Sequence, residues 1–185
     1  LPDGVINLVY VDGPTLGDVC FKHPQFAGVH FTGSTGVFNQ MWKTIGENIH
    51  DSILVINEST SFPGTLRNFI KPTVEKYSAK AIEHLYAISP ERVDPGRKDF
   101  DQKNTPRLYA GLTKEAARRT QEFYSKFCDK LVEVSSPEVA EAAKLFENTF
   151  RQVNIALVNE FAQITHALGI SVYETLDAAN TKPYG

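Results

Sequence analysis

Three polar side chains lie at helical spacing in the otherwise apolar stretch VAEAAKLFENTFRQVNIALVNEF, residues 139–161. At 100° per residue, Lys144, Asn148 and Arg151 fall within about 60° of arc, with Glu141 beside them. A cation and an amide on one helix face could together bind an oxygen atom that gains negative charge during a reaction. A solvated face with ordinary surface ion pairs has the same spacing, so the pattern alone leaves both interpretations open.

A second candidate site follows a predicted strand in INESTSFPGT, where the strand ends at Asn57. Glu58, Ser59 and Thr60 come directly after it, and Thr65 is expected to cap the next helix. Ligands of open parallel sheets gather beyond the carboxyl ends of strands, where helix N-termini offer free N–H groups. These three residues are therefore candidates for binding a cofactor, although turn formation and capping would explain them equally well.

A similar turn occurs in HFTGSTGVF, where Gly33 and Ser34 lie between a predicted strand and a helix. Glycine lets the backbone approach a phosphate closely, and the helix dipole adds partial positive charge. The turn lacks the GxGxxG pattern of dinucleotide-binding loops, and we find that pattern nowhere in the chain. An ordinary left-handed turn is as good an interpretation as a pyrophosphate-binding loop.

Composition and charge restrict the class of protein. The chain has 185 residues, 42% of them apolar, which is enough for one domain, or one domain with an appendage. With a formal charge of −3 and scattered basic residues, we expect neither nucleic acid nor a membrane as a partner. Cys20, Cys128 and the five histidines have no metal-binding spacing, so no metal and no disulfide are expected. Without a membrane span or secretion signal, a cytoplasmic address is expected.

Apolar runs rich in β-branched residues alternate with stretches of helical period. The expected strands are 5–11, 28–33, 52–57, 84–89, 107–112 and 130–135, and the expected helices are 14–22, 37–50, 64–78, 114–127, 136–168 and 171–179. This alternation predicts an α/β fold with a doubly wound, mostly parallel sheet. Three prolines and many charges between residues 89 and 106 predict a long surface loop.

The helix expected at residues 136–168 begins at a Ser-Pro-Glu cap and ends before Gly169. At 1.5 Å per residue it would be about 45 Å long, longer than a small α/β layer is wide. Its C-terminal half is apolar around most of its circumference and needs cover on several sides. We expect a second copy of the same helix as the cover, with another domain as the alternative.

Residues 52–185 resemble the middle of a nucleotide-sugar 6-dehydrogenase. The motifs ILVINESTSFPGT, YAISPERVDPG, EVSSPEVAEAAKLFENTFRQVNIALVNE and DAANTKPYG carry the resemblance, in the order and spacing of that family. The SPERVDPG form resembles the branch that acts on UDP-N-acetylhexosamines rather than on UDP-glucose. Members of the family oxidise the C6 alcohol of the sugar to a carboxylate with two NAD, through an aldehyde and a cysteine thioester, for polysaccharide biosynthesis.

The resemblance implies roles for particular residues. Thr60 matches a threonine near the nicotinamide and the reacting water, and Glu91 matches a glutamate in the loop over the sugar. Lys144 and Asn148 match the pair that binds the C6 oxygen. We therefore expect these four residues to be catalytic, and the residues expected to bind the UDP-sugar are Glu91, Arg92, Lys144, Asn148 and Arg151. The long apolar helix matches the central dimerisation helix of the family, which implies a homodimer.

Residues 1–50 are similar instead to the cofactor domain of an aldehyde dehydrogenase of the pyrroline-5-carboxylate type, through LPDGVINLVYVDGPTLGD and KHPQFAGVHFTGSTGVFNQMWKTIGENI. In that family the serine of FTGS, here Ser34, lies against the NAD pyrophosphate, and Gly33 permits the approach. The chain thus resembles a mosaic joined near residues 48–52. The expected parts are 1–50, a βαβα piece, 51–135, the second part of a Rossmann-like NAD-binding domain, and 136–185, a helical central and dimerisation domain.

The leading hypothesis is a fragment of an NAD-dependent nucleotide-sugar 6-dehydrogenase that is inactive alone. The GxGxxG loop and the nucleophilic cysteine of that family are not among the 185 residues, and neither cysteine present has the nucleophile's context. One alternative is an aldehyde dehydrogenase fragment, since residues 1–50 resemble that family. Another is a noncatalytic module that dimerises or binds a nucleotide through residues 136–168.

Overall fold

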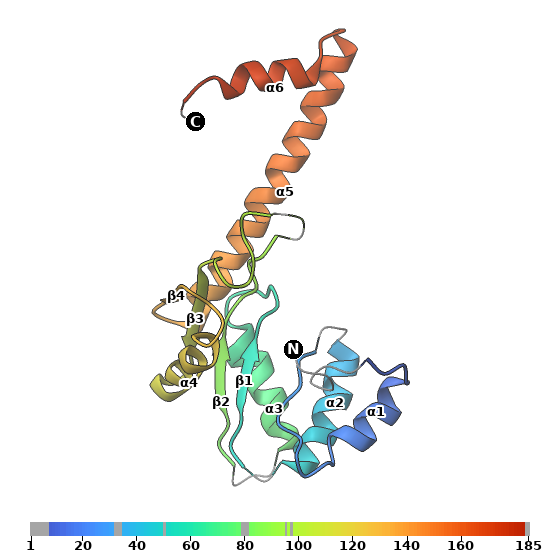
Figure 1. The fold of residues 1–185 in the computed structure, drawn as a ribbon, viewed down its shortest axis with the longest axis vertical. Coiled ribbons are helices and arrows are strands. Elements are labelled where there is room, and N and C mark those ends of the chain that lie inside the picture. The colour runs from blue at the N-terminus through green and yellow to red at the C-terminus, as the bar shows by residue number, and fades with distance from the viewer. Residues whose placement is uncertain are drawn as a thin grey trace.

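The computed structural model describes residues 8–31, 35–49, 51–78, 82–94, 96 and 98–183 (Figure 1). The two strands expected nearest the N-terminus are wrong where they can be checked, because residues 8–11 and 28–31 have no regular structure. The remainder of those predicted strands, which includes Gly33, lies outside the described residues, as does Ser34. Leu8, Val9 and Tyr10 are 79%, 65% and 92% exposed. A β-branched run forms a strand only where a neighbouring strand pairs with it, and here none does.

The described residues form one sheet of four strands in the order β1-β2-β3-β4. The strands are β1 (Leu54–Asn57), β2 (Leu85–Ile88), β3 (Arg107–Gly111) and β4 (Leu131–Glu133). β1 pairs parallel with β2, and β3 pairs parallel with β4. β2 and β3 are antiparallel because a loop rather than a helix joins them. The prediction of a mostly parallel sheet is confirmed.

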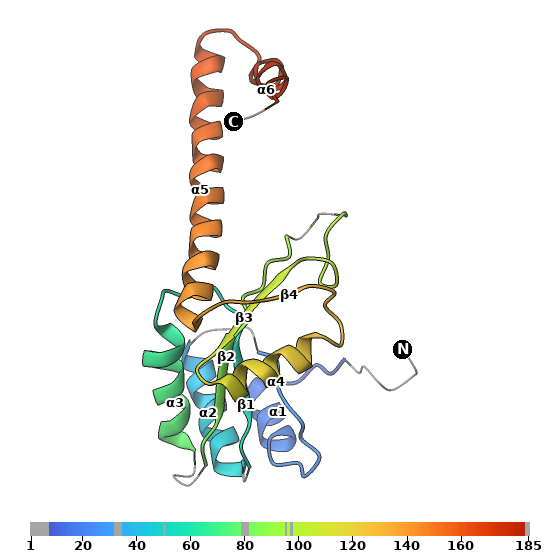
Figure 2. The ribbon, with the colours of Figure 1, turned by 90° about the vertical axis from the view of Figure 1, so that its left-hand side faces the viewer.

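Helices cover both faces of the sheet. α3 (Lys71–Tyr77) lies on one face and α4 (Lys114–Tyr124) on the other (Figure 2). The helix expected at 64–78 is divided, because a π-helical turn, η1 (Leu66–Ile70), precedes α3. Pro72 has no N–H to donate to Asn68, so the i→i−4 ladder is interrupted there.

The first part of the chain is attached to this layer through α2 (Thr35–Asn48), against which α1 (Gly13–Cys20) packs. Buried Trp42 donates its indole N–H to the carbonyl of Val74 at 2.7 Å. A Cβ at Gly46 would lie 2.5 Å from the carbonyl oxygen of Tyr77, so only glycine allows the two helices to approach this closely. The core cluster of buried residues consists of Trp42, Ile45, Leu66, Val74, Tyr86, Ile88, Ala110 and Ala140.

The long helix is present as α5 (Pro137–Ala167), 31 residues or about 46 Å. It begins where Ser136 accepts from the N–H of Val139, and it ends before Gly169, whose φ is +70°. Its first turns pack on β2 and β3, and the rest projects beyond the sheet towards α6 (Val172–Asn180) (Figure 1). No helix among the described residues is long and apolar enough to span a membrane.

Candidate functional site

The ends of β1 and β2 bring two predicted site segments together. The Ser89 N–H donates to the Asn57 carbonyl at 2.9 Å, and the Glu91 N–H donates to the Glu58 carbonyl at 3.0 Å. These bonds extend the parallel pairing past the strands, so residues 58–60 lie beside the loop that starts at Glu91. The site therefore forms at the carboxyl ends of parallel strands, where it was expected.

The structure brings Thr60, Asn148 and Arg151 into contact. The Asn148 amide donates through Nδ2 to Oγ1 of Thr60 at 3.0 Å. Its oxygen accepts from a terminal nitrogen of Arg151 at 2.7 Å. The two bonds fix which way the amide points and connect α5 to the loop after β1. The helical stripe inferred from the sequence thus reaches the strand ends, while Arg151 stays exposed.

Lys144 lies one turn before Asn148 and is half-buried. Burial lowers the pKa of its ammonium, with the positive charges of Arg151 and Arg92 acting in the same direction and the carboxylates of Glu147 and Glu91 opposing them. To the other described residues it makes no hydrogen bond or ion pair. An ammonium group that is partly desolvated and without a fixed partner is suited to bind an anionic or partly anionic oxygen.

The carboxylate of Glu91 is fully engaged by the protein. One oxygen accepts from the N–H groups of Arg92 and Val93, both at 2.7 Å, and the other accepts from Gln102 at 2.7 Å and Arg107 at 3.0 Å. Burial raises its pKa, but these donors and the positive charge of Arg107 outweigh burial, so the pKa lies below its ordinary value. Glu91 is thus an ionised anchor of its loop.

Two ion pairs attach this loop to α5. Arg92 binds Glu147 through two nitrogens at 2.6 and 3.2 Å and donates to the Pro106 carbonyl at 2.8 Å. Arg151 lies 3.6 Å from a carboxylate oxygen of Asp94. The guanidinium of Arg92, expected to bind the sugar nucleotide, is therefore already occupied by protein acceptors.

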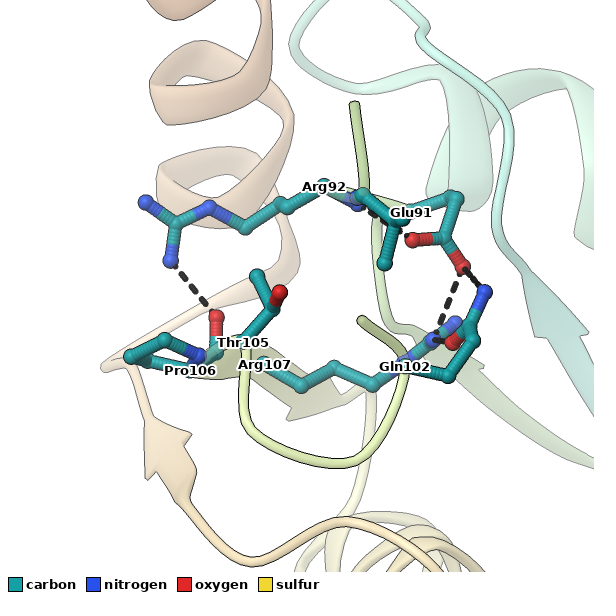
Figure 3. Close-up of a pocket in the computed structure, with 7 residues that line it drawn as sticks. Glu91, Arg92, Gln102, Thr105, Pro106 and Arg107 are labelled. Carbon is teal, nitrogen blue, oxygen red and sulfur yellow. Dashed lines mark hydrogen bonds and ion pairs between the residues drawn. The ribbon is translucent and has the colours of Figure 1, made fainter. Parts of the chain in front are cut away.

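A small cavity lies inside the loop, between Glu91 and Arg92 on one side and Thr105 and Arg107 on the other (Figure 3). Its volume is about 10 Å³. That is room for one water molecule at most, so the cavity is not a sugar-binding pocket. Lys144 is not among the residues that line it.

The residues after β1 that were expected to bind the cofactor differ in how many protein contacts they make. The Glu58 carboxylate binds Arg107 and the Tyr124 hydroxyl, and its second oxygen lies 3.3 Å from Nδ1 of His30. Ser59 takes part in a turn in which its N–H donates to the Asn57 side chain at 3.2 Å. The Glu58 carboxylate is therefore occupied by protein groups, and Ser59 and Thr60 remain as the cofactor candidates at the end of β1.

Sequence reasoning missed two buried charged residues. Glu141, interpreted as part of a surface stripe, is 1% exposed and accepts from the N–H groups of Gly64 and Leu66 at 2.5 and 2.9 Å. Thr65 does stand at the N-cap position before η1, but its side chain does not cap the helix, because its hydroxyl donates to the Phe62 carbonyl at 2.6 Å instead. Free N–H groups after a Pro-Gly turn signal that a cap is needed, but not which distant residue supplies it.

Arg107 is the second missed residue. It is the first residue of β3, and its side chain is 6% exposed. An arginine at the edge of an apolar run is usually taken as the polar end of a strand, so no local signal separated it from a surface residue. The only sequence signal was the presence of nearby acidic residues without assigned partners.

The two cysteines differ in burial. Cys128 is buried, which raises the pKa of its thiol, and its sulfur donates to the Gln102 carbonyl at 3.4 Å. Cys20 is partly exposed on α1, in the region that packs on α2. That neither cysteine forms a thioester stays a prediction.

Comparison with known proteins identifies both parts of the chain. The NAD binding domain of the UDP-glucose/GDP-mannose dehydrogenase family matches residues 30–128, and the central domain of that family matches residues 138–185. The aldehyde dehydrogenase family matches residues 1–56, which fits a mosaic, although the two matches share residues 30–56.

Individual relatives agree with these matches. The chain is 37% identical over 143 residues to a UDP-N-acetyl-D-mannosamine dehydrogenase of Pyrococcus horikoshii, covering 76% of this chain and 34% of that protein. It is 38% identical, with the same coverage, to a UDP-N-acetyl-D-glucosamine 6-dehydrogenase of Pseudomonas aeruginosa. The chain thus spans about a third of the length of these relatives.

Solved structures show the same likeness in three dimensions. The UDP-D-ManNAc dehydrogenase of Pyrococcus horikoshii superposes with a TM-score of 0.70 at 34% identity, over 82% of this chain and 37% of that one. The UDP-N-acetyl-mannosamine dehydrogenase Cap5O of Staphylococcus aureus gives a TM-score of 0.67 at 30% identity, with the same coverage. The chain therefore belongs to the UDP-glucose/GDP-mannose dehydrogenase family.

Proposed function

We propose that this chain supplies the sugar-oxygen site of an NAD-dependent nucleotide-sugar 6-dehydrogenase acting on a UDP-N-acetylhexosamine. The observation that carries the proposal is the hydrogen bond from Asn148 to Thr60, beside the half-buried ammonium of Lys144, which has no hydrogen bond or ion pair to the other residues that the structure describes. The names of the most similar relatives support the substrate class. The product would be a UDP-uronate, which would be made in the cytoplasm as a precursor for polysaccharide.

In this proposal Lys144 and Asn148 bind the C6 oxygen of the sugar. When C6 is oxidised, that oxygen gains negative charge, and donors already in place stabilise it without reorganisation. The loss of one such donor typically costs roughly 3–4 kcal/mol of transition-state stabilisation. Thr60 holds the Asn148 amide in place, and the exposed guanidinium of Arg151 would bind the phosphates or the sugar in place of its ion pair with Asp94. Glu91 and Arg92 contribute by shaping the loop beside the sugar.

NAD, when bound, would accept the hydride from C6. The family's NAD binding domain matches residues 30–128, which supports this cofactor. Ser59 and Thr60 at the end of β1 are the described side chains that fit it, since the Glu58 carboxylate is held by Arg107 and Tyr124. Gly33 and Ser34, the other candidates, lie outside the described residues.

The proposal includes a homodimer through α5. Six apolar side chains recur on α5 and just after it at the three- and four-residue spacing of a coiled-coil seam, and each is between 56% and 71% exposed: Phe146, Phe150, Val153, Leu157, Ile164 and Leu168. At 100° per residue they fall within about 60° of arc. A continuous exposed apolar stripe of this kind is stabilised when a second copy covers it.

A ligand-dependent thermal shift tests the function. The wild-type chain should melt at a higher temperature with UDP-N-acetylmannosamine, because a ligand that binds only the folded state stabilises it by about 2.7 kcal/mol at 100 times its Kd. Lys144→Ala should lose the shift, whereas Lys126→Ala, at an exposed position in the turn after α4, should keep it. A shift with pyrroline-5-carboxylate alone would favour the aldehyde dehydrogenase alternative, and no shift with either ligand would favour a noncatalytic module.

A further inference from the structure

Arg107 uses all of its hydrogen-bonding capacity inside the protein. Its Nε donates to Oγ of Ser89 at 2.7 Å, one terminal nitrogen donates to Glu91 and Gln102 at 3.0 and 3.1 Å, and the other binds Glu58 and the Ser89 carbonyl. An arginine has five N–H groups, and each has an acceptor here. An interior cation with a complete set of partners has one orientation.

The acceptors of Arg107 come from separate segments. Glu58 follows β1, Ser89 and Glu91 follow β2, and Gln102 belongs to the loop before β3. The guanidinium also lies over the ring of Tyr124 on α4, with its carbon 4.1 Å from the ring centroid. One side chain therefore fixes the relative positions of two strand ends, a loop and a helix.

The segments fixed by Arg107 are the ones that face α5 at the proposed site. Glu58 is two residues from Thr60, which accepts from Asn148, and Glu91 begins the loop that binds α5 through Arg92. Within the described part of the chain Arg107 makes no hydrogen bond or ion pair with Lys144 or Asn148, so its influence on them is indirect. Without the guanidinium, the carboxylates of Glu58 and Glu91 would be left near one another without their shared cation.

We infer that Arg107 is a positioning residue for the proposed oxygen site, holding the loops of Thr60 and Glu91 at the separation that Lys144 and Asn148 require. The inference rests on the proposed function. The planar fork of arginine is necessary, because it binds Glu58, Glu91 and Ser89 simultaneously, whereas a lysine ammonium is a single point charge. Arg107 acts through its neighbours and is not assigned contact with the substrate.

NMR on the full 185-residue chain without ligand tests the inference. The two readouts are the titration midpoint of the Glu91 carboxyl carbon and the side-chain amide signals of Asn148. Arg107→Met should raise the Glu91 midpoint, because it removes a nearby cation, and should shift the Asn148 amide, because the loop of Thr60 moves. Arg107→Lys should keep the midpoint low but still shift the amide. Arg119→Met, an exposed arginine of α4, should change neither signal.

Unchanged Glu91 and Asn148 signals in Arg107→Met would overturn the inference. If Arg107→Met fails to fold, Arg107→Lys decides alone, and an Asn148 amide signal identical to that of the wild type would contradict the inference.

A binding measurement separates the inference from the proposed function. Binding of UDP-N-acetylmannosamine should weaken about tenfold in Arg107→Lys, which corresponds to one charge-assisted hydrogen bond to the sugar lost when the site is displaced. Undiminished binding in that variant, with binding lost in Lys144→Ala, would remove the positioning role and leave the proposed function intact. A third outcome is that the Arg107 variants show the expected NMR changes but the wild-type chain does not bind UDP-N-acetylmannosamine. That outcome would support the positioning role of Arg107 and overturn the proposed function.

Discussion

The two halves of α5 have similar helix-forming sequences but opposite surroundings. In the half that starts at Pro137, Ala140 and Glu141 are 0% and 1% exposed, and polar side chains reach neighbouring loops. In the half beyond Val153, large apolar side chains such as Leu157 and Ile164 are mostly exposed. In a single copy of α5, a residue is buried when a neighbouring segment covers it, whether or not its side chain is hydrophobic. The first half carries the proposed chemistry, and the proposed association seam starts at Phe146 in that half and continues along the second half.

The largest expected effect breaks the association half. Leu157→Asp places a charge in the seam of both copies, at a cost of about 3 kcal/mol each and therefore roughly 6 kcal/mol per dimer. Sedimentation should show a monomer at concentrations where the wild type is a dimer. Gln163→Asp, which lies about 120° away around the helix, should remain dimeric. A wild-type chain that sediments as a monomer at every concentration would refute the dimer.

The next effect concerns stability and the buried half. Glu141→Ala leaves the N–H groups of Gly64 and Leu66 without an acceptor and should lower the free energy of unfolding by about 3 kcal/mol. Glu160→Ala in the exposed half should change it by less than about 0.5 kcal/mol. Urea unfolding in the Leu157→Asp background removes the contribution of association. Equal losses in the two variants would mean that the halves do not differ as described.

A smaller effect is the pH dependence of the packed body. Burial lowers the pKa of His84 below 6.5, and its Nδ1 accepts from the Ile53 N–H at 3.4 Å. The unfolded chain takes up a proton near pH 6.5 and the folded chain only at lower pH, so stability should fall as the pH drops below 6.5. His84→Asn should flatten this slope in unfolding measurements between pH 7 and about 5. His166→Gln, exposed on α5, should retain it; a flattened slope there instead would contradict the assignment.

The sequence was a good guide wherever structure depends on local signals. β1 to β4 lie within their predicted ranges, and Ser136 caps α5 as expected. Local signals were insufficient for residues 8–11 and 28–31, because a strand also needs a pairing partner. The loop between β2 and β3 was foreseen, and the antiparallel pairing it produces follows from the missing helix.

The candidate site was predicted in part. The stripe of Lys144, Asn148 and Arg151 was found from spacing and resemblance together, and the structure places Thr60 against it. Glu141 and Arg107 were not found, because their partners are distant in sequence and depend on the folded chain. Buried charges with tertiary partners have no local pattern, so this part of the site required coordinates.

The most direct test of the central claim measures how Lys144 recognises one atom of the sugar. Calorimetry would compare wild type and Lys144→Ala, each with UDP-N-acetylmannosamine and with its 6-deoxy analogue, which lacks the C6 oxygen. The account predicts that Lys144→Ala weakens binding of the parent compound about tenfold or more and leaves binding of the analogue unchanged. An equal loss for both ligands, or no loss for either, would contradict the claim that Lys144 binds the C6 oxygen.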